Sequence, residues 1–186
     1  MRSTRRNFLQ GSAAGLISAN MPGGLQWLTP SAAFAASAPL SRLTAEEGAL
    51  LGEFADILVP SAKAAGVAHF VDHHLTLQPA DCFLILRYLD WPPPFLNFYR
   101  DGLSALTRFI AARAATGLAG LDGTGRENLV RALLKDPPPD WSGSPSAQLF
   151  YFVLRADAID VAYGTQAGFE RLGIPYLAHI EPSSPW

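Results

Sequence analysis

Apolar side chains recur at helical spacing along most of the chain beyond residue 43. The first run follows Thr44-Ala45-Glu46-Glu47, a capping box in which the threonine side chain accepts from an early helical N–H and Glu47 reaches back. Its apolar positions, three and four residues apart, are Leu50, Leu51, Phe54, Ile57 and Leu58. The pattern predicts a helix that begins near residue 44 and ends at Pro60.

The same spacing predicts four further helices. We expect them at 67–75, at 98–115, after a second capping box at Thr124-Gly125-Arg126-Glu127, and from Ser144-Pro145 to Tyr163. The apolar segment 81–89 is compatible with a helix or a buried strand, because periodicity does not separate the two over so few residues. No segment alternates clearly with period two, so we predict one mainly α domain of five or six helices.

The last residues, 164–186, change in character. They combine large apolar side chains with three glycines and three prolines, Gly164, Gly168, Gly173, Pro175, Pro182 and Pro185. This composition is too apolar for a free tail and too interrupted for a helix. We expect an irregular strap that lies on this domain or on a partner.

The first 35 residues indicate targeting. Arg2, Arg5 and Arg6 form a positive start without acids, and Arg5-Arg6 is followed by Asn7, Phe8 and Leu9. The next stretch, to about Leu28, is diluted by glycine, serine, asparagine and proline. It therefore falls short of the roughly 20 apolar residues of a membrane span. We predict a twin-arginine export signal in which Arg5, Arg6, Phe8 and Leu9 are recognised.

A processing site is predicted at Ala33-Phe34-Ala35, an A-x-A arrangement that places the cut before Ala36. A cut after Ala38 is the alternative. The predicted division is a signal peptide at 1–35, a linker at 36–42 and a helical domain at 43–186.

Charge and cysteine content exclude several classes of function. Without the leader, 11 Lys and Arg remain against 16 Asp and Glu, which argues against a nucleic-acid partner. The lone cysteine, Cys82, has no partner for an internal disulfide and lies in an apolar run typical of a buried thiol. No C-x-x-C-H occurs, so covalent haem is excluded from this chain.

His69, Asp72 and His73 are the metal-ligand candidates, because positions i, i+3 and i+4 share one helical face. The set is incomplete, and the one isolated histidine elsewhere is His179. Ordinary surface or partly buried histidines are the simpler interpretation. No metal site is therefore assigned.

Catalytic patterns are weak. No serine lies in G-x-S-x-G, and the glycines at 120, 123 and 125 follow no strand. Asp157 and Asp160, with Glu53 and Asp56, are carboxylates that acid–base chemistry would need, yet we expect the first two on the solvated face of the last helix.

Aromatic residues are numerous for so small a domain. Residues 150–152, Phe-Tyr-Phe, cannot all face one core, because successive helical residues are about 100° apart. The surplus predicts a subunit interface, for which the candidate contacts are Phe150, Tyr151, Phe169, Tyr176 and Trp186.

Several stretches resemble one family when taken in order behind the leader. They are Leu43–Glu47, Phe54–Pro60, Ala64–Val67, Phe70–Asp72, Tyr99–Leu106, Phe150–Leu154, Tyr163-Gly164 and Gly173–Pro175. Together they resemble the gluconate 2-dehydrogenase subunit 3 family, although residues 77–94 depart from its pattern.

The resemblance implies the small, non-catalytic subunit of a membrane-associated dehydrogenase for sugars or sugar acids. In that family the large subunit holds FAD and lacks its own signal, and a cytochrome c subunit with haem c passes electrons onward. The implied role is to stabilise the large subunit and carry it through the twin-arginine translocase to the periplasm, at the outer face of the inner membrane. The family supplies no catalytic motif, so no catalytic or cofactor-binding residue is named in this chain.

A second hypothesis stays open from the residues alone. It is a self-sufficient periplasmic metal-binding protein or enzyme that uses His69, Asp72 and His73.

Overall fold

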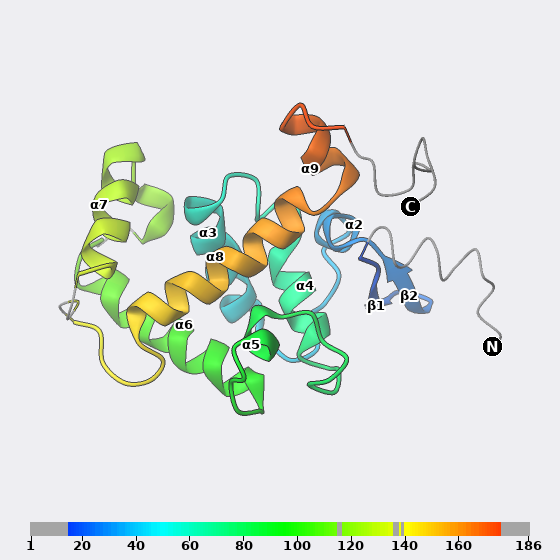
Figure 1. Ribbon diagram of the computed structural model, residues 1–186, viewed down its shortest axis with the longest axis horizontal. Helices are drawn as coiled ribbons and strands as arrows, with labels where there is room; N and C mark the ends of the chain where they lie inside the picture. Colours follow the sequence, from blue (N-terminus) through cyan, green and yellow to red (C-terminus); the bar gives the residue numbers. More distant parts are fainter. Residues whose placement is uncertain (1–14, 115–116, 136–137, 139, 176–186) are drawn as a thin grey trace, which may run out of the picture.

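The computed structural model describes residues 15–175 apart from 115–116, 136–137 and 139 (Figure 1). Its elements in chain order are β1 (Ile17–Met21), β2 (Gly24–Leu28), α2 (Pro30–Ala35), α3 (Ala45–Leu58), α4 (Val67–His74), α5 (Ile85–Tyr88), α6 (Phe95–Ala111), the 3₁₀ turn η1 (Leu118–Gly120), α7 (Gly123–Leu133), α8 (Ala147–Tyr163) and α9 (Gln166–Arg171). The prediction of a mainly α domain is confirmed.

The main apolar core lies among α3, α4, α6 and α8. Helix α8 contacts the other three and crosses in front of α3 and α4 (Figure 1). Among the largest fully buried side chains are Phe54, Tyr99, Phe109 and Phe150. Burial of a side chain of this size contributes about 1.5–3 kcal/mol, so these aromatic residues supply much of the driving force for packing the helices together.

The capping-box motif predicted the start of α3 correctly. Thr44 Oγ1 accepts from Glu47 N at 3.1 Å and Glu47 Oε2 accepts from Thr44 N at 2.8 Å, which confirms the capping box. The second predicted box is wrong: Asp122 caps α7 by accepting from Gly125 N at 2.7 Å. Helix α8 begins two to three residues later than expected, because Ser146 is its cap.

The described residues hold eight α-helices, more than the expected five or six. The additional ones are short. Segment 81–89, left open between helix and strand, contains the four-residue α5. Part of the predicted strap is also helical: Thr165 caps α9 by accepting from Gly168 N at 3.1 Å. The rest of the strap, 176–186, lies outside the described residues.

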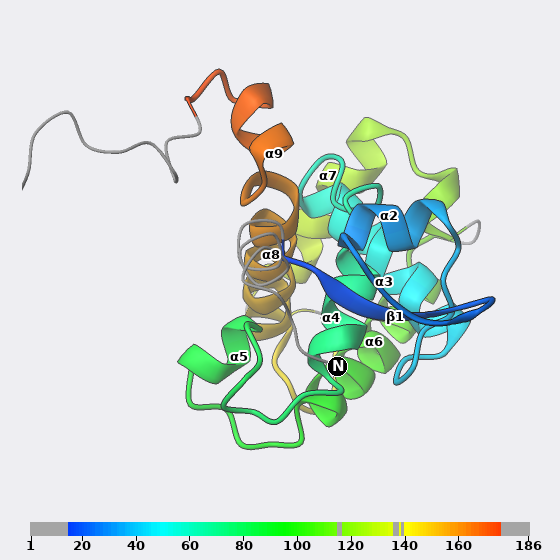
Figure 2. The ribbon, with the colours of Figure 1, turned by 90° about the vertical axis from the view of Figure 1, so that its right-hand side faces the viewer.

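An antiparallel hairpin was not expected. It pairs Ile17 with Leu28 and Met21 with Gly24, and α2 follows it directly. The hairpin and α2 lie against α4 (Figure 2). Within the described part of the chain, no helix combines the length and the apolar character that a membrane span requires.

Candidate functional site

His69, Asp72 and His73 do lie on one face of α4, but the structure commits each to the preceding segment of the chain. Asp72 accepts the backbone N–H groups of residues 41, 42 and 43 at 2.7–2.8 Å. His69 Nε2 donates to the carbonyl of Ala38 at 2.9 Å, and His73 Nδ1 accepts from Ser18 N at 3.2 Å. No group of three or more His, Cys, Asp or Glu in the described ranges is arranged to hold a metal ion.

Asp157 is buried, which corrects its expected place on a solvated face. It is 0% exposed and accepts from Tyr99 Oη at 2.5 Å and from Ile85 N at 3.0 Å. Burial raises its pKa to about 7, against the opposing effect of these two hydrogen bonds. Asp160 is exposed, as expected.

This carboxylate has no route to a substrate in the folded conformation. Both oxygens of Asp157 are occupied, and Tyr99 is likewise fully buried, with its pKa raised by burial and by the neighbouring carboxyl. The pair therefore joins α5, α6 and α8. The sequence did not indicate these contacts, because Tyr99 and Ile85 are 58 and 72 residues away from Asp157 in the chain.

Cys82 is a buried thiol at 0% exposure, and its Sγ lies 3.5 Å from the carbonyl of Pro79. Burial raises the pKa of this thiol, the opposite of what a nucleophilic cysteine needs.

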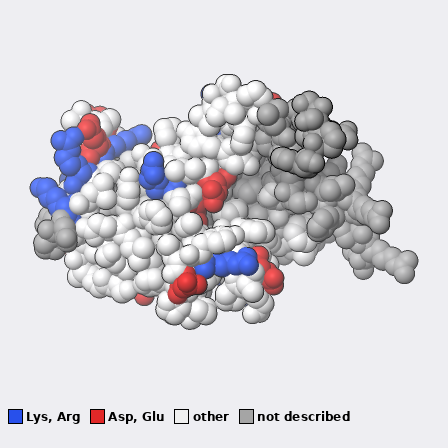
Figure 3. Space-filling view, in the orientation of Figure 1, with Lys and Arg blue, Asp and Glu red and all other residues white. Residues whose placement is uncertain are grey.

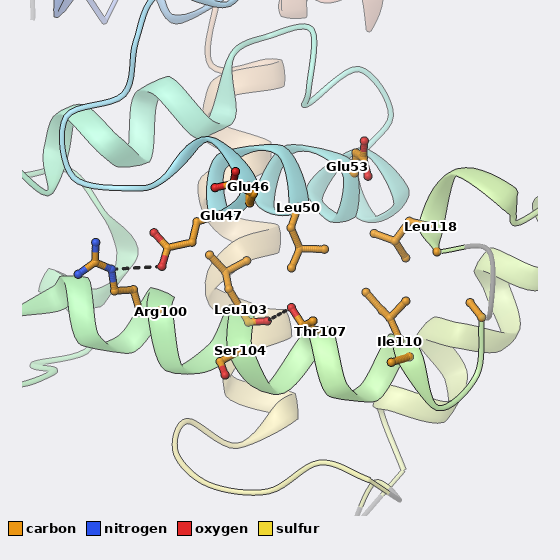
Figure 4. A pocket seen from close by; sticks show the side chains of 13 residues that line it. Glu46, Glu47, Leu50, Glu53, Arg100, Leu103, Ser104, Thr107, Ile110 and Leu118 are labelled. Atoms are coloured by element: carbon orange, nitrogen blue, oxygen red, sulfur yellow. Dashed lines mark hydrogen bonds and ion pairs between the residues drawn. The ribbon is translucent and has the colours of Figure 1, made fainter.

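A groove of about 700 Å³ runs between α3 and α6 (Figure 4). Leu50 of α3 and Leu103 and Ile110 of α6 point into it, with Leu118 at one end. Its rim carries Glu46, Glu53 and the ion pair of Arg100 Nε with Glu47 Oε1 at 3.2 Å. Such a groove can receive an apolar side chain, and it presents no nucleophile paired with a base.

Exposed apolar side chains also occur on the side of the molecule where α5, α8 and α9 lie. Helix α8 contacts both of the others, and Figures 1 and 2 place α5 and α8 on the same side. The exposed large apolar side chains there are Phe83, Tyr88, Leu89, Phe152, Leu172 and Ile174, each 40–62% exposed. We call these six residues the α8 face. Figure 3 shows that this side is mostly uncharged, with one basic and one acidic group near α8 and a row of acidic and basic side chains over α5, whereas Lys and Arg gather over α7.

The residues predicted to contact a partner differ in their burial. Phe150 is fully buried in the core, and Tyr151 and Phe169 are half-buried. Phe152 is the exposed member of the Phe-Tyr-Phe run, at 49%. Its outward position follows from the 100° helical step once Phe150 is known to face inward. Tyr176 and Trp186 lie outside the described residues, as do His179 and the export residues Arg5, Arg6, Phe8 and Leu9.

Comparison with known proteins decides the family. A family model described as gluconate 2-dehydrogenase subunit 3 matches residues 45–179. The chain belongs to the gluconate 2-dehydrogenase subunit 3 family. No curated protein and no solved structure matches the chain.

Membership of the gluconate 2-dehydrogenase subunit 3 family makes this chain a subunit of a dehydrogenase complex. The match begins at Ala45, so β1, β2 and α2 precede the part that it covers. The α8 face lies within the matched residues, and so does the groove between α3 and α6.

Proposed function

We propose that this chain is the non-catalytic small subunit that binds the FAD-dependent large subunit of a sugar or sugar-acid dehydrogenase, stabilises it and carries it through twin-arginine export. The chain itself holds no cofactor in this proposal. FAD belongs to the large subunit, and a cytochrome c subunit with haem c is a possible third member. The complex works in the periplasm, at the outer face of the inner membrane.

The α8 face is the observation that carries the proposal. Six large apolar side chains remain exposed in or next to α5, α8 and α9, of which α8 contacts the other two, and a monomer gains nothing from leaving these side chains in water. A specific complex buries on the order of 1,200–2,000 Å² in total, with apolar and aromatic residues at its centre. Phe152 lies on the longest of the three elements and is our candidate for the central contact.

Folded export supports the carrier role. A twin-arginine leader at Arg5-Arg6 sends folded proteins across the membrane, so a large subunit without its own signal can travel with FAD already bound. Binding of the two subunits must then precede export.

The test is isolation of the tagged full chain from its own cells, with flavin fluorescence and mass spectrometry of what accompanies it. We expect an FAD-containing dehydrogenase in stoichiometric amount. Phe152→Asp should weaken the complex at least roughly tenfold, because a charge replaces a buried apolar contact.

Leu134→Asp is the matched control, since Leu134 is also exposed, at 42%, but follows α7 and is not one of the six residues of the α8 face. Recovery of the wild-type chain without any flavoprotein contradicts the proposal. If the two substitutions weakened the complex equally, the α8 face would not be the binding surface for the large subunit.

A further inference from the structure

We propose that residues 17–38 are a permanent part of the folded protein, bound to α4 by His69 and His73, and that folding protects the Ala33-Phe34-Ala35 sequence from processing. The inference concerns this chain alone. What a retained segment implies for export rests on the proposed function.

Hydrogen bonds hold both ends of this segment on α4. At the start, Ser18 contacts His73 Nδ1 through its N–H at 3.2 Å and its hydroxyl at 3.1 Å. At the end, the carbonyl of Ala38 accepts from His69 Nε2 at 2.9 Å. Asp72, between the two histidines, then fixes the next stretch by accepting three consecutive backbone N–H groups, those of residues 41–43. Such charge-assisted bonds are stronger than neutral ones.

The segment also has its own small apolar core. Ile17, Ala19, Ala33 and Ala38 are each at most 6% exposed and form one cluster. Two ring contacts add to it, Trp27 with His73 and Phe34 with His69, each with centroids 6.3 Å apart. These contacts leave the two histidines facing the segment.

The backbone of α2 comes very close to the start of α4. A Cβ atom on Gly66 would lie 2.0 Å from the carbonyl oxygen of Pro30, and Gly66 has φ +85°. Only glycine permits both this conformation and this approach. The domain therefore contains a position shaped to receive α2.

The predicted processing site forms the last turn and the C-cap of α2, with Ala33 buried and residues 34–37 exposed. Ala33 is 0% exposed and donates its N–H to the carbonyl of Thr29 at 2.9 Å, while Ala36 donates to Ala32 at 2.9 Å. Cleavage of a folded segment requires local opening, so its rate falls with the population of the open form. A chain that has folded before export thus presents a helix where the peptidase needs an open backbone.

A retained segment has one consequence for the proposed carrier. The leader stays covalently joined to the folded subunit, because residues 17–38 connect the two.

The first test needs neither export nor a partner. The full chain with Arg5→Lys and Arg6→Lys is purified from the cytoplasm and treated with a protease that cuts after small residues, and cuts at 33–38 are followed by mass spectrometry. We expect cutting at least roughly tenfold slower than in a synthetic peptide of residues 29–40. Equal rates would overturn the inference.

A matched pair of variants in the same background isolates docking. Ile17→Asp places a carboxylate in the small core, and Leu25→Asp makes the same change at a position 64% exposed on the partner strand. Only Ile17→Asp should raise cutting at 33–38 toward the peptide's rate. No difference between the two variants contradicts docking as the cause of protection.

The second test is the intact mass of the wild-type chain recovered from the periplasm. We expect a mass that includes residues 17–38. A chain that begins at Ala36 or Pro39 overturns the inference while leaving the carrier proposal standing. Failure of the chain to bring a flavoprotein would instead count against the carrier proposal alone.

Discussion

Tyr99 Oη lies 2.5 Å from Asp157 Oδ2 and donates a hydrogen bond to it, which joins α6 to α8 in the core. The other oxygen of Asp157 accepts from Ile85 N at 3.0 Å and so fixes the start of α5. These two hydrogen bonds therefore link α5 and α8, which carry Tyr88 and Phe152 of the α8 face.

Removing the hydroxyl should destabilise the protein. Tyr99→Phe leaves a buried carboxyl oxygen without its donor, which costs about 1–3 kcal/mol in the free energy of unfolding. Urea denaturation at pH 6 measures it. Tyr88→Phe is the control, because Tyr88 is 62% exposed and its hydroxyl should matter by less than about 0.5 kcal/mol. Equal costs would show that the Tyr99–Asp157 bond does not stabilise the fold.

Asp157 should make stability fall as pH rises. Its pKa is about 7 in the folded protein against an ordinary value of 3.8, so the fold binds the proton more tightly than the unfolded chain does. Its contribution is fully present below pH 3.8 and is lost as pH rises through about 7.

Asp157→Asn is the reference for that measurement, since an amide can accept from Ile85 N and donate to Tyr99. Relative to it, the wild type should lose up to about 1.4 kcal/mol per pH unit between pH 4 and 7. The urea-derived free energies of both proteins from pH 4 to 8.5 test this. A difference that does not change with pH contradicts the raised pKa.

His74 should act in the opposite direction. Burial, with a smaller contribution from His73, lowers its pKa to about 4 from 6.5. Its stabilising contribution is therefore present above pH 6.5 and lost as pH falls toward 4. An NMR titration of the imidazole signals should show His74 still neutral at pH 5.5. Protonation near pH 6.5 would be inconsistent with the burial described for this side chain.

Gly102 should not tolerate a methyl group. A Cβ atom there would lie 2.2 Å from the ring of Phe150, where α6 and α8 meet. Gly102→Ala should therefore cost about 1–3 kcal/mol through overpacking. Gly123→Ala, with nothing within 4 Å of the added atom, should be neutral or stabilise by up to about 1 kcal/mol. Thermal unfolding compares the two.

Features determined by nearby residues could be predicted from the sequence. The capping box at Thr44 is an example, since Glu47, its partner, is three residues away. The burial of Asp157 could not, because its hydrogen-bond donors come from positions 85 and 99. Asp122 was overlooked as a cap because Thr124 and Glu127 matched the box pattern just as well.

The N-terminal hairpin escaped prediction for another reason. Its alternation is short, with Ile17 and Ala19 buried between less buried neighbours, and its small residues matched an export leader equally well. His69, Asp72 and His73 were correctly placed on one helical face, but spacing alone does not show what that face binds.

The central claim is that this chain carries a flavoprotein through export. In the proposal, Arg5→Lys with Arg6→Lys should disable the predicted export leader, and it leaves residues 17–175 unchanged. The decisive measurement is FAD-dependent dehydrogenase in the periplasm of cells with the wild-type chain and with this variant. We expect the flavoprotein to reach the periplasm only with the wild type. Its arrival there with the leader disabled would contradict the account.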